Sequence, residues 1–531
     1  MALTLARAGH RVVVLEKGPA YDQRDFIHDE IATCRRDFFT PYPAEDPHIL
    51  VEGAGRPRRS AEGWTACCVG GGTTHMSGFT YRLHPEDLRL RSLLGEVAGS
   101  TLADWPIRWE ELLPCYERME VELGVSGEAG RNPFETFRQP LPLPPLPVNG
   151  IALLVDEACS KLGLHSFPTA RAILSRAWQG RARCQLSFFC GSYGCPTGAR
   201  STSLSALLPK AVATGNCQVR PLSMVHTIEV DRAGRPLGVL YFDPQGTEQR
   251  LRAAVVVVAC SAVESARLLL HSRSPAHPEG LANESGLVGR NLMFASFGTG
   301  AAEFSRSDAR IAAIDWRQPF VNRSFQDLYL LDRDSPQPRK GGTVSFLFPH
   351  ANPIFTAERL ATEAREPLWG AALKQSLRRV YREVRELEFE VFSETLPVAD
   401  SRVTLDPKVK DRWGVPAARL TMVRHPQDPE TNRRLVEKGL EVLRTMGGEH
   451  VRTTRAGSQM YVVQGGTCRF GDDPRSSALD RDCRSRSAPN LFVADGSVMP
   501  TLGGVPNTLT IEANALRVGE RIIALGRAHE L

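Results

Sequence analysis

The sequence predicts an α/β fold, α+β overall, in which a Rossmann-like nucleotide-binding domain is interwoven with a second domain. Near the start, a helix over 1–8 is stopped by Gly9, and 11–15 form a buried strand. Near the end, a strand over 490–494 is followed by a helix over 510–525. Because these segments lie at opposite ends of the chain, the domain must be assembled from distant parts of the sequence.

The segment 1–16 forms the second half of a dinucleotide-binding βαβ unit. In such a unit the acid that ends the second strand accepts hydrogen bonds from the adenosine ribose, and Glu16 occupies that position. The first strand and the GxGxxG turn, whose N–H groups approach the pyrophosphate, do not occur in the sequence. We therefore expect that Met1 is an internal methionine. Genomic sequence just upstream without an in-frame Gly-rich strand–turn segment would contradict this expectation.

The middle of the chain predicts the rest of the nucleotide-binding sheet. Strands over 218–230 and 238–242 flank a turn at 231–234, which indicates an inserted β-meander. A continuous apolar strand over 252–259, typical of a parallel sheet, leads into a helix over 261–272. Residues 300–450 are more polar, with an Arg- and Glu-rich helical stretch near 358–388, and we interpret them as facing the substrate.

Composition narrows the class of protein. The chain has 531 residues, too many for one ordinary domain, and its formal net charge of +5 is too small to indicate a nucleic-acid partner. The short basic runs 56–59 and 481–486 are typical of a solvated surface. No apolar run reaches the roughly 18 to 20 residues that a transmembrane helix needs. We expect a cytoplasmic protein. Because the natural start is expected upstream of Met1, the presence of an export signal stays open.

The cysteines do not predict a metal site. Cys184, Cys190 and Cys195 lie close in the sequence, with five and then four residues between them. A structural zinc ion takes four ligands that usually include close pairs. We therefore interpret these three residues as structural thiols and expect no metal.

Five segments together resemble the glucose–methanol–choline (GMC) oxidoreductase family. They are LARAGHRVVVLEKGP, CVGGGTTHMSG, DWPIRWEELLPCYERMEVELGVSG, CGSYGCPTGARSTSLSALLPKA and NLFVADGSVMPTLGGVPNTLTIEANALRVGERI. Their order over most of the chain is specific, whereas 300–450 carry little of the resemblance. The branch is similar to gluconate dehydrogenase flavoproteins, pyranose oxidases and long-chain alcohol oxidases.

The resemblance implies FAD as cofactor and assigns domains. An FAD-binding domain would comprise 1–95, 184–300 and 456–531, with a substrate or cap segment over 96–183. A substrate-binding domain built on an antiparallel sheet would comprise 301–455. The implied cofactor-binding residues are Glu16, Gly70, Gly71, Gly72, Thr73, Thr74, His75, Val225, Asp495, Gly496, Thr508 and Leu509.

The roles of these residues also follow from the resemblance. Glu16 would hold the adenosine ribose, and 70–74 would wrap the pyrophosphate and flavin. Val225, placed at the end of a strand, would meet adenine through its backbone. Asp495 and Gly496 would lie at the pyrophosphate–ribityl junction, and Thr508 and Leu509 would approach the pyrimidine side of the ring.

His75 raises the question of a covalent flavin. Pyranose oxidases carry their flavin on the histidine of a Thr-His-Trp triplet, and this sequence has Thr74-His75-Met76 at that place. The alternative is a histidine that lies beside the ring without a bond. Acid precipitation separates the two, because colour lost entirely to the supernatant excludes the bond.

The catalytic residues match the family only in part. Flavin-dependent alcohol oxidation needs a base for the hydroxyl proton, commonly a histidine, and a second polar group that orients the hydroxyl. The position of the base, three residues before Gly466-Thr467, is Val463, and the adjacent Gln464 is no base. Asn507 is the candidate for the second group, although it follows Pro506 where the family more often has Asn-Pro, and it could instead close a turn. Another base, such as a histidine of the substrate domain, could replace the missing one.

Three functions remain open. The leading hypothesis is an FAD-dependent dehydrogenase or oxidase that acts on the CH–OH group of an alcohol, sugar or polyol. The electron acceptor could be oxygen, a quinone or a cytochrome. The absent histidine favours an alternative, a catalytically silent or electron-transfer flavoprotein. A nicotinamide-dependent dehydrogenase is the third, and the Asp495-Gly496-Ser497 segment argues against it.

A family glycine is also replaced near the cofactor. The Ala-Gly pattern that ends the strand over 252–259 becomes Cys260-Ser261. A tight turn beside FAD often needs glycine, because glycine alone adopts positive φ at no steric cost. This further departure from the family pattern argues against ordinary histidine-base catalysis.

Overall fold

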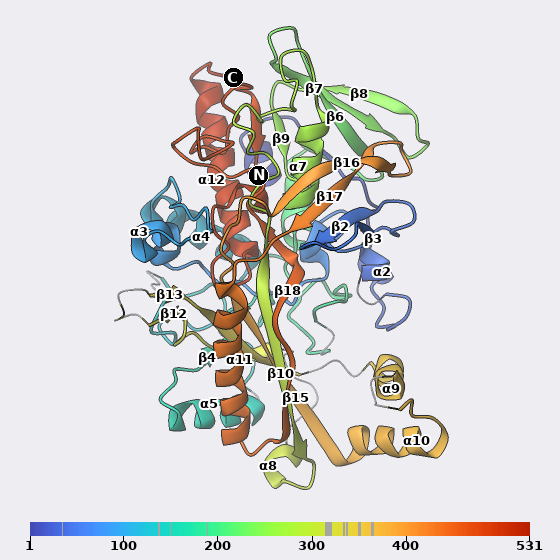
Figure 1. Ribbon diagram of the computed structural model, residues 1–531, viewed down its shortest axis with the longest axis vertical. Helices are drawn as coiled ribbons and strands as arrows, with labels where there is room; N and C mark the ends of the chain where they lie inside the picture. Colours follow the sequence, from blue (N-terminus) through green and yellow to red (C-terminus); the bar gives the residue numbers. More distant parts are fainter. Residues whose placement is uncertain are drawn as a thin grey trace.

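The computed structural model is a mixed α/β structure, as the sequence predicts (Figure 1). It describes all residues except 34–35, 136–138, 149, 188–189, 314–320, 333–334, 336–337, 349–351 and 363–365. The parts that resemble a nucleotide-binding domain occupy one end of the elongated molecule. The long antiparallel strands run toward the other end (Figure 1).

The nucleotide-binding half contains two pairs of parallel strands. β1 (Val12–Leu15) pairs with β5 (Cys217–Arg220), and β9 (Val256–Val258) pairs with β19 (Leu491–Val493). Each pair joins strands more than two hundred residues apart. The interweaving predicted from the two ends of the chain is therefore confirmed by the strand pairing.

Three helices accompany these strands close to their predicted bounds. They are α1 (Ala2–Arg7), α7 (Ser261–His271) and α12 (Thr508–Arg527). α1 packs on α12, where the side chains of Met1 and Thr4 lie against Gly519. A hydrophobic stripe on each helix explains its burial, since the buried positions recur at helical spacing.

Two further sheets flank this half. The predicted meander is present as β6 (Met224–Val230), β7 (Pro236–Phe242) and β8 (Glu248–Arg252), all antiparallel. A four-stranded sheet has the order β16-β17-β2-β3. Its strands are β16 (Arg402–Lys410), β17 (Pro416–Met422), β2 (His48–Glu52) and β3 (Arg58–Ser60). The pairing of β17 with β2 is parallel and joins residues near 50 to residues near 420.

The second half is built on a six-stranded antiparallel sheet of order β18-β10-β15-β14-β11-β4. The strands are β18 (Glu449–Gly465), β10 (Met293–Ser305), β15 (Val384–Ser393), β14 (Gly342–Leu347), β11 (Val321–Phe325) and β4 (Phe167–Pro168). α11 (Gln427–Thr445) and α5 (Gly150–Lys161) cover one face, where Leu435 and Leu440 pack against Phe389 and Val391. The antiparallel sheet expected from the resemblance is therefore present.

The single helical stretch predicted near 358–388 is longer than the helices that the structure has there. The structure has α9 (Pro353–Thr362), α10 (Gly370–Arg378) and a π-helical turn over Arg379–Glu383, and then strand β15 begins at Val384. Buried and partly exposed residues alternate from Val384 to Val391. This period of two is that of a strand with one buried face, and it outweighs the helical preference of Arg and Glu.

The remaining elements are short connections or local packing units. They are α2 (Arg36–Phe39), α3 (Leu90–Leu94), α4 (Trp109–Leu123), α6 (Leu208–Ala213), α8 (Ala309–Ala312), β12 (Leu330–Leu331) and β13 (Arg339–Lys340). Gly124 ends α4 in a left-handed conformation. Within the described residues, we find no helix that is both long and apolar enough to cross a membrane.

Candidate functional site

A large cavity of about 1810 Å³ connects the two halves of the molecule. Its wall includes the end of β1, the starts of α7 and α12, and the pocket-facing side of β10 and β15. Small-molecule sites typically measure about 300–1,000 Å³. The cavity therefore has room for a dinucleotide together with a substrate.

Glu16 lies on the cavity wall directly after β1. Its Oε1 accepts a hydrogen bond from the backbone N–H of Gly18 at 2.7 Å, and burial raises the pKa of the carboxyl. The next residue, Lys17, reaches Asp46 at 2.6 Å and Glu264 of α7 at 3.4 Å. These ion pairs fix the end of β1 relative to α7, so that Glu16 has a defined position at the nucleotide end.

Val225 also lies on the cavity wall, but the strand position predicted for it is wrong. It is the second residue of β6, not the end of a strand, and it pairs with Tyr241 of β7. The prediction from the sequence ran β5 and β6 together as one strand over 218–230. The structure separates them by a turn in which Leu222 has a φ of 53°.

The glycine-rich turn is a 3₁₀ helix over Gly71–Thr74. Gly70 has a φ of 97°, and a Cβ there would lie 2.8 Å from Cβ of Leu204. A Cβ on Gly72 would lie 2.3 Å from Cγ2 of Thr65, whereas one on Gly71 would meet nothing within 4 Å. The turn thus needs glycine for its conformation and packing, and its open side faces the cavity.

Thr73 and Thr74 take different positions. Thr73 lines the cavity, and its hydroxyl donates to the carbonyl of Gly70 at 2.7 Å. Thr74 is buried behind the turn, and its carbonyl accepts a hydrogen bond from Arg200 at 2.6 Å. Of these two residues, Thr73 is therefore placed to contact a ligand and Thr74 supports the turn.

The N-termini of α7 and α12 both open on the cavity, through Ser261 and Thr508. Helix N-termini carry partial positive charge, which favours phosphate or another anion. Asp495, at the end of β19, accepts hydrogen bonds from the backbone N–H of Ser261 and Ser497 at 3.0 and 2.8 Å. It therefore joins β19 to the start of α7.

Ser261 adopts a φ of 85°, a conformation that favours glycine. This is the position where the family pattern has glycine, so the turn keeps a demanding geometry with a less suitable residue. We predict that Ser261→Gly stabilises the protein by about 1 kcal/mol, because a non-glycine residue in this region costs about 1–2 kcal/mol. Urea unfolding measures the change, and an unchanged or lower midpoint would contradict it.

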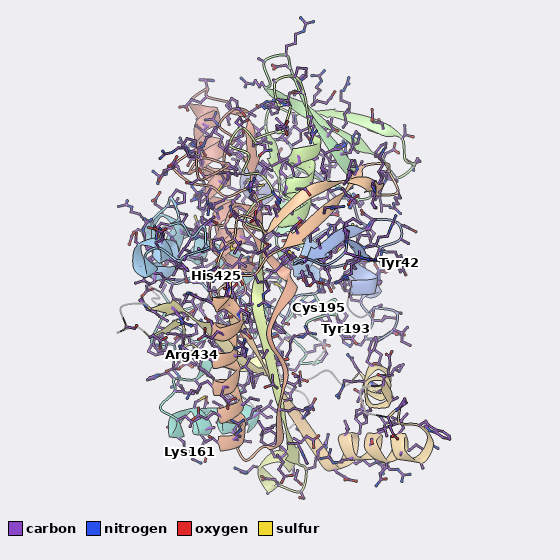
Figure 2. All side chains as sticks on the ribbon, in the orientation of Figure 1. Tyr42, Lys161, Tyr193, Cys195, His425 and Arg434 are labelled. Carbon is purple, nitrogen blue, oxygen red and sulfur yellow. The ribbon has the colours of Figure 1, made fainter. Side chains whose placement is uncertain are left out.

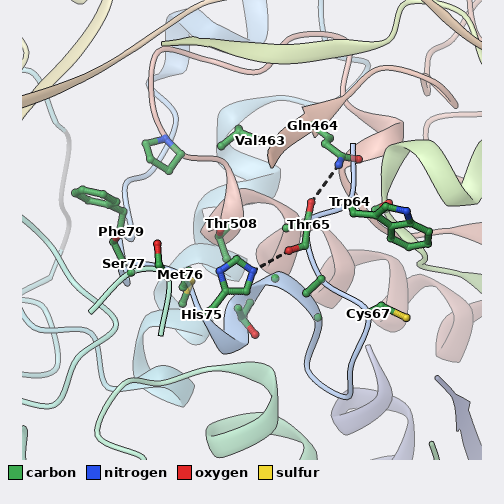
Figure 3. Close-up of a pocket in the computed structure, with 18 of the residues that line it drawn as sticks. Trp64, Thr65, Cys67, His75, Met76, Ser77, Phe79, Val463, Gln464 and Thr508 are labelled. Atoms are coloured by element: carbon green, nitrogen blue, oxygen red, sulfur yellow. Dashed lines mark hydrogen bonds between the residues drawn. The ribbon is translucent and has the colours of Figure 1, made fainter. Parts of the chain in front are cut away.

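His75 lies at the centre of the cavity wall (Figure 3). Its Nε2 is 2.7 Å from the carbonyl oxygen of Thr65, and its ring stacks on Phe39 with centroids 4.9 Å apart. Gln464 donates to Oγ1 of the same Thr65 at 3.1 Å. Thr65 thus connects His75 to the strand that carries Val463 and Gln464. The covalent flavin link stays a prediction.

Gln464 and Asn507 are adjacent in the structure. The side-chain amide of Asn507 donates to the backbone carbonyl of Gln464 at 3.1 Å and lies 3.5 Å from Sδ of Met499. Asn507 precedes α12 but makes no side-chain capping bond to that helix. Oε1 of Gln464 is shielded from solvent and has no hydrogen-bond partner. Both side chains lie on the cavity wall, so the pair can hold a hydroxyl group.

The two residues that follow Asn507 differ in exposure. Thr508 lines the cavity, whereas the side chain of Leu509 is buried in the main core. Leu509 therefore has only its backbone available to a flavin. Gly496 lines the cavity as well, and a Cβ there would lie 2.5 Å from the carbonyl oxygen of Gln464.

The replacement base expected from the substrate domain is not found in the described part of the wall. The histidines that line the cavity there are His75, His226 and His271. Nδ1 of His271 lies 2.9 Å from the carbonyl oxygen of His226, at the nucleotide end. His350 lies outside the described residues. No described residue of 301–455 on the wall is a histidine.

Sequence reasoning missed a row of three glutamates. Glu386, Glu388 and Glu390 alternate along β15 and line the cavity, while Leu387 and Phe389 point into the core. Burial raises the pKa of Glu388 to about 7 and that of Glu390 to about 8. The pattern Glu-x-Glu-x-Glu at a spacing of two could have revealed them, had the segment been predicted as a strand.

The three cysteines lie near one another without a disulfide (Figure 2 labels Cys195). Burial would raise the pKa of the Cys195 thiol, but the charge of Arg200 and hydrogen bonds from Thr197 and from the backbone of Arg200 together outweigh it, and the pKa is lowered. In the part of the chain that the structure describes, no three His, Cys, Asp or Glu side chains are grouped to hold a metal ion.

Comparisons with known proteins identify close similarities. Two family models, both described as GMC oxidoreductase, match residues 65–295 and 397–515. The chain is 33% identical to 6'''-hydroxyparomomycin C oxidase of Streptomyces lividus over 474 residues, which is 86% of this chain and 79% of that protein. It is 30% identical to 2-methyl-1,2-propanediol dehydrogenase of Mycolicibacterium austroafricanum, over 98% of this chain and 92% of that protein.

Solved structures share the fold at lower identity. Pyridoxine 4-oxidase from Mesorbium loti superposes with a TM-score of 0.62 at 19% identity, over 98% of this chain and 96% of that one. Formate oxidase of Aspergillus oryzae superposes with a TM-score of 0.65 at 14% identity, over 99% and 96%. Both likenesses extend over nearly the whole chain, including the long antiparallel strands.

Proposed function

The chain belongs to the GMC oxidoreductase family, whose cofactor is FAD and whose members oxidise alcohols and sugars, and we propose that it oxidises a CH–OH group by hydride transfer to the flavin. The observation that carries this proposal is the adjacent pair Gln464 and Asn507 in a cavity that begins at Glu16.

The residues on the wall fit FAD. An acid follows β1 at the nucleotide end, a glycine turn opens on the cavity, and two helix N-termini converge beside it. Glu16 would hold the ribose, the backbone of 70–73 and of Gly496 would contact the phosphates and ribityl chain, and Thr508 would face the ring. When bound, FAD supplies the hydride acceptor.

The chain's own residues orient the substrate. The amide of Asn507 and the unpartnered Oε1 of Gln464 would hold the hydroxyl group, so that its carbon is presented in a single orientation. Neither amide has basic strength for the hydroxyl proton, and Val463 offers no polar atom. We infer that the proton leaves to water, which makes turnover slow near neutral pH.

The domain division proposed here follows the sequence boundaries. Residues 1–95, 184–300 and 456–531 would bind FAD, 301–455 would bind substrate, and 96–183 would form a cap. The substrates named for the relatives include hydroxyparomomycin C, paromamine and a propanediol. We propose a polyhydroxy substrate of similar kind for this chain, with oxygen, a quinone or a cytochrome as the acceptor.

The test is anaerobic reduction of the FAD-loaded protein by a panel of sugars, polyols and alcohols, followed by the spectrum. Bleaching of the oxidised flavin supports the proposal. A bound flavin that no compound of the panel reduces would support the alternative, a silent or electron-transfer flavoprotein. The absence of a base at Val463 and Gln464 favours this alternative. Acid precipitation of the same sample shows whether colour stays with the protein through His75.

Asn507→Ala should lower kcat/KM by about 100-fold without loss of FAD, because a misplaced hydroxyl costs about that much in rate. Stopped-flow reduction measures the change. Asn514→Ala is the matched control, since Asn514 is a buried amide on the same helix that bonds Sγ of Cys483 and does not line the cavity. Equal losses in both variants would show that Asn507 serves only to close a turn.

A further inference from the structure

The pocket-facing side of β15 carries three carboxyl groups in different electrostatic settings. Glu386 forms an ion pair with Arg452 of β18. Glu388 shares a hydrogen bond with Glu386, and the positive charge of Arg359 opposes the rise in its pKa that burial causes. Glu390 makes neither a hydrogen bond nor an ion pair among the described residues, and its Oε1 is shielded from solvent.

The surroundings of Glu390 offer little compensation for a negative charge. Its strand neighbours are the uncharged Thr299 of β10 and Ser345 of β14. Burial raises its pKa to about 8; the charge of Arg171 opposes this rise and that of Glu388 adds to it. Arg171 donates to the backbone carbonyls of Val321, at 2.8 Å, and Ser77, its Nε has no hydrogen-bond partner, and no ion pair joins it to Glu390 among the described residues.

Arg455 of β18 is the other cation to consider. It pairs with Thr299 across β10 and β18, so it lies two strands from Glu390, and it is largely exposed. No salt bridge between the two side chains is present in the described structure. A buried carboxyl on a cavity wall without a compensating partner is costly to ionise unless a cation of the ligand pairs with it.

Glu390 lies far from the proposed reacting end. On β10, Phe294 pairs with Gln464, and Thr299 pairs with Glu390. At about 3.4 Å per residue, the stretch from Phe294 to Thr299 rises about 17 Å. Glu390 is therefore too distant to take the proton of a hydroxyl held by Gln464 and Asn507, and it can contact only a remote part of a substrate.

An apolar patch on the cavity wall lies between the two ends. The rings of Phe297 and Phe392 lie 5.4 Å apart, and those of Phe79 and Phe392 lie 6.0 Å apart, all on the cavity wall. Such a surface accepts an alkyl chain or the apolar face of a sugar ring. The wall thus presents, in order, a hydroxyl-binding pair, an apolar middle and a buried carboxyl.

We propose that Glu390 binds a protonated amine at the far end of the substrate, so that the enzyme selects amino alcohols or amino sugars long enough to reach from Gln464 past the phenylalanines. This inference rests on the proposed function. The ammonium donates charge-assisted hydrogen bonds to the carboxylate and offsets the repulsion between Glu390 and Glu388.

The binding test uses n-hexylamine, which has no hydroxyl to oxidise, and calorimetry on the FAD-loaded protein. Glu390→Gln should weaken its binding by about tenfold or more, since the ion pair is lost while the shape is kept. Glu383→Gln is the control, because Glu383 is exposed just before β15 and undergoes the same change of charge. Equal affinity of wild type and Glu390→Gln would overturn the proposal.

The pH dependence of this binding has a defined sign. Glu390 must ionise to pair, so the affinity for n-hexylamine should rise as the pH passes through its pKa of about 8. It should fall again as the amine loses its proton, near about 10.4 for an alkyl ammonium such as that of lysine. A flat profile between these limits, or one unchanged in Glu390→Gln, would contradict a role for the carboxylate.

Turnover separates this proposal from the proposed function. Straight-chain alcohols with an amine at the opposite end are compared with n-alkanols of equal length. Glu390→Gln should lower kcat/KM about tenfold or more for the long amino alcohols and leave the n-alkanols unchanged. Oxidation of both series without preference would contradict the amine site and leave the proposed oxidase function standing. Amine binding that depends on Glu390, without oxidation of any alcohol, would defeat the oxidase function alone.

Discussion

Val463→His should accelerate reduction of the bound flavin by about 100-fold or more at neutral pH, because a positioned general base contributes about 10²–10⁴-fold. By the resemblance of the sequence, Val463 would take the place of the family's histidine. It is only partly buried and lines the cavity beside Gln464 (Figure 3), so the larger side chain has space on the pocket side. Stopped-flow absorbance under anaerobic conditions measures the rate.

The pH profile identifies the reason for such a gain. A histidine base gives a rate that rises with pH through about 6.5 and then levels off, since only the neutral imidazole accepts a proton. Val463→Asn is the control, because it adds polarity of similar size without a base. If Val463→His retains FAD but reduces it no faster than the wild type, the proton does not leave at this position.

Gly496→Ala should weaken FAD binding by about tenfold or more and should destabilise the protein by about 1–3 kcal/mol. A Cβ on Gly496 would lie 2.5 Å from the carbonyl oxygen of Gln464, which is backbone and cannot rotate away. The same carbonyl accepts the hydrogen bond of Asn507, so the clash also disturbs the hydroxyl-binding pair. FAD titration followed by fluorescence measures the affinity, and thermal unfolding measures the stability.

Gly526→Ala provides the matched control. Gly526 lies in the last turn of α12, exposed, and a Cβ there would meet nothing within 4 Å. Alanine is favoured over glycine in a helix by about 1 kcal/mol, so this variant should be no less stable than the wild type and should keep its FAD. Tight FAD binding by Gly496→Ala would show that the approach of this backbone is not what admits the cofactor.

Local patterns predicted the elements that frame the cofactor site. The helix, glycine and strand before Glu16, and the strand and helix around Asp495, have strong short-range signals: continuous β-branched runs, helical spacing of apolar residues and a glycine stop. These signals depend only on neighbours in the sequence. For this reason the framing elements appear close to their predicted bounds.

The sequence was less informative where two tendencies competed. In 384–393, charged residues favour helix and the alternation favours strand, and the buried face of the six-stranded sheet decides the outcome. The prediction that Val225 ends a strand failed because two strands follow each other with a tight turn between them. Such turns are set by the pairing partners of each strand, which lie elsewhere in the chain.

The sequence by itself determined the kind of protein, an α/β enzyme of the GMC oxidoreductase family. It also predicted an acid for the ribose, a glycine turn at the cofactor and no histidine at the usual catalytic position. Only the tertiary structure decided that Gln464 lies against Asn507, that Thr65 joins Gln464 to His75, and that Glu390 faces the same cavity without a hydrogen-bond partner for its Oε1. These contacts depend on strand register and on burial between distant segments. Both are properties of the assembled sheets, so no window of the sequence contains them.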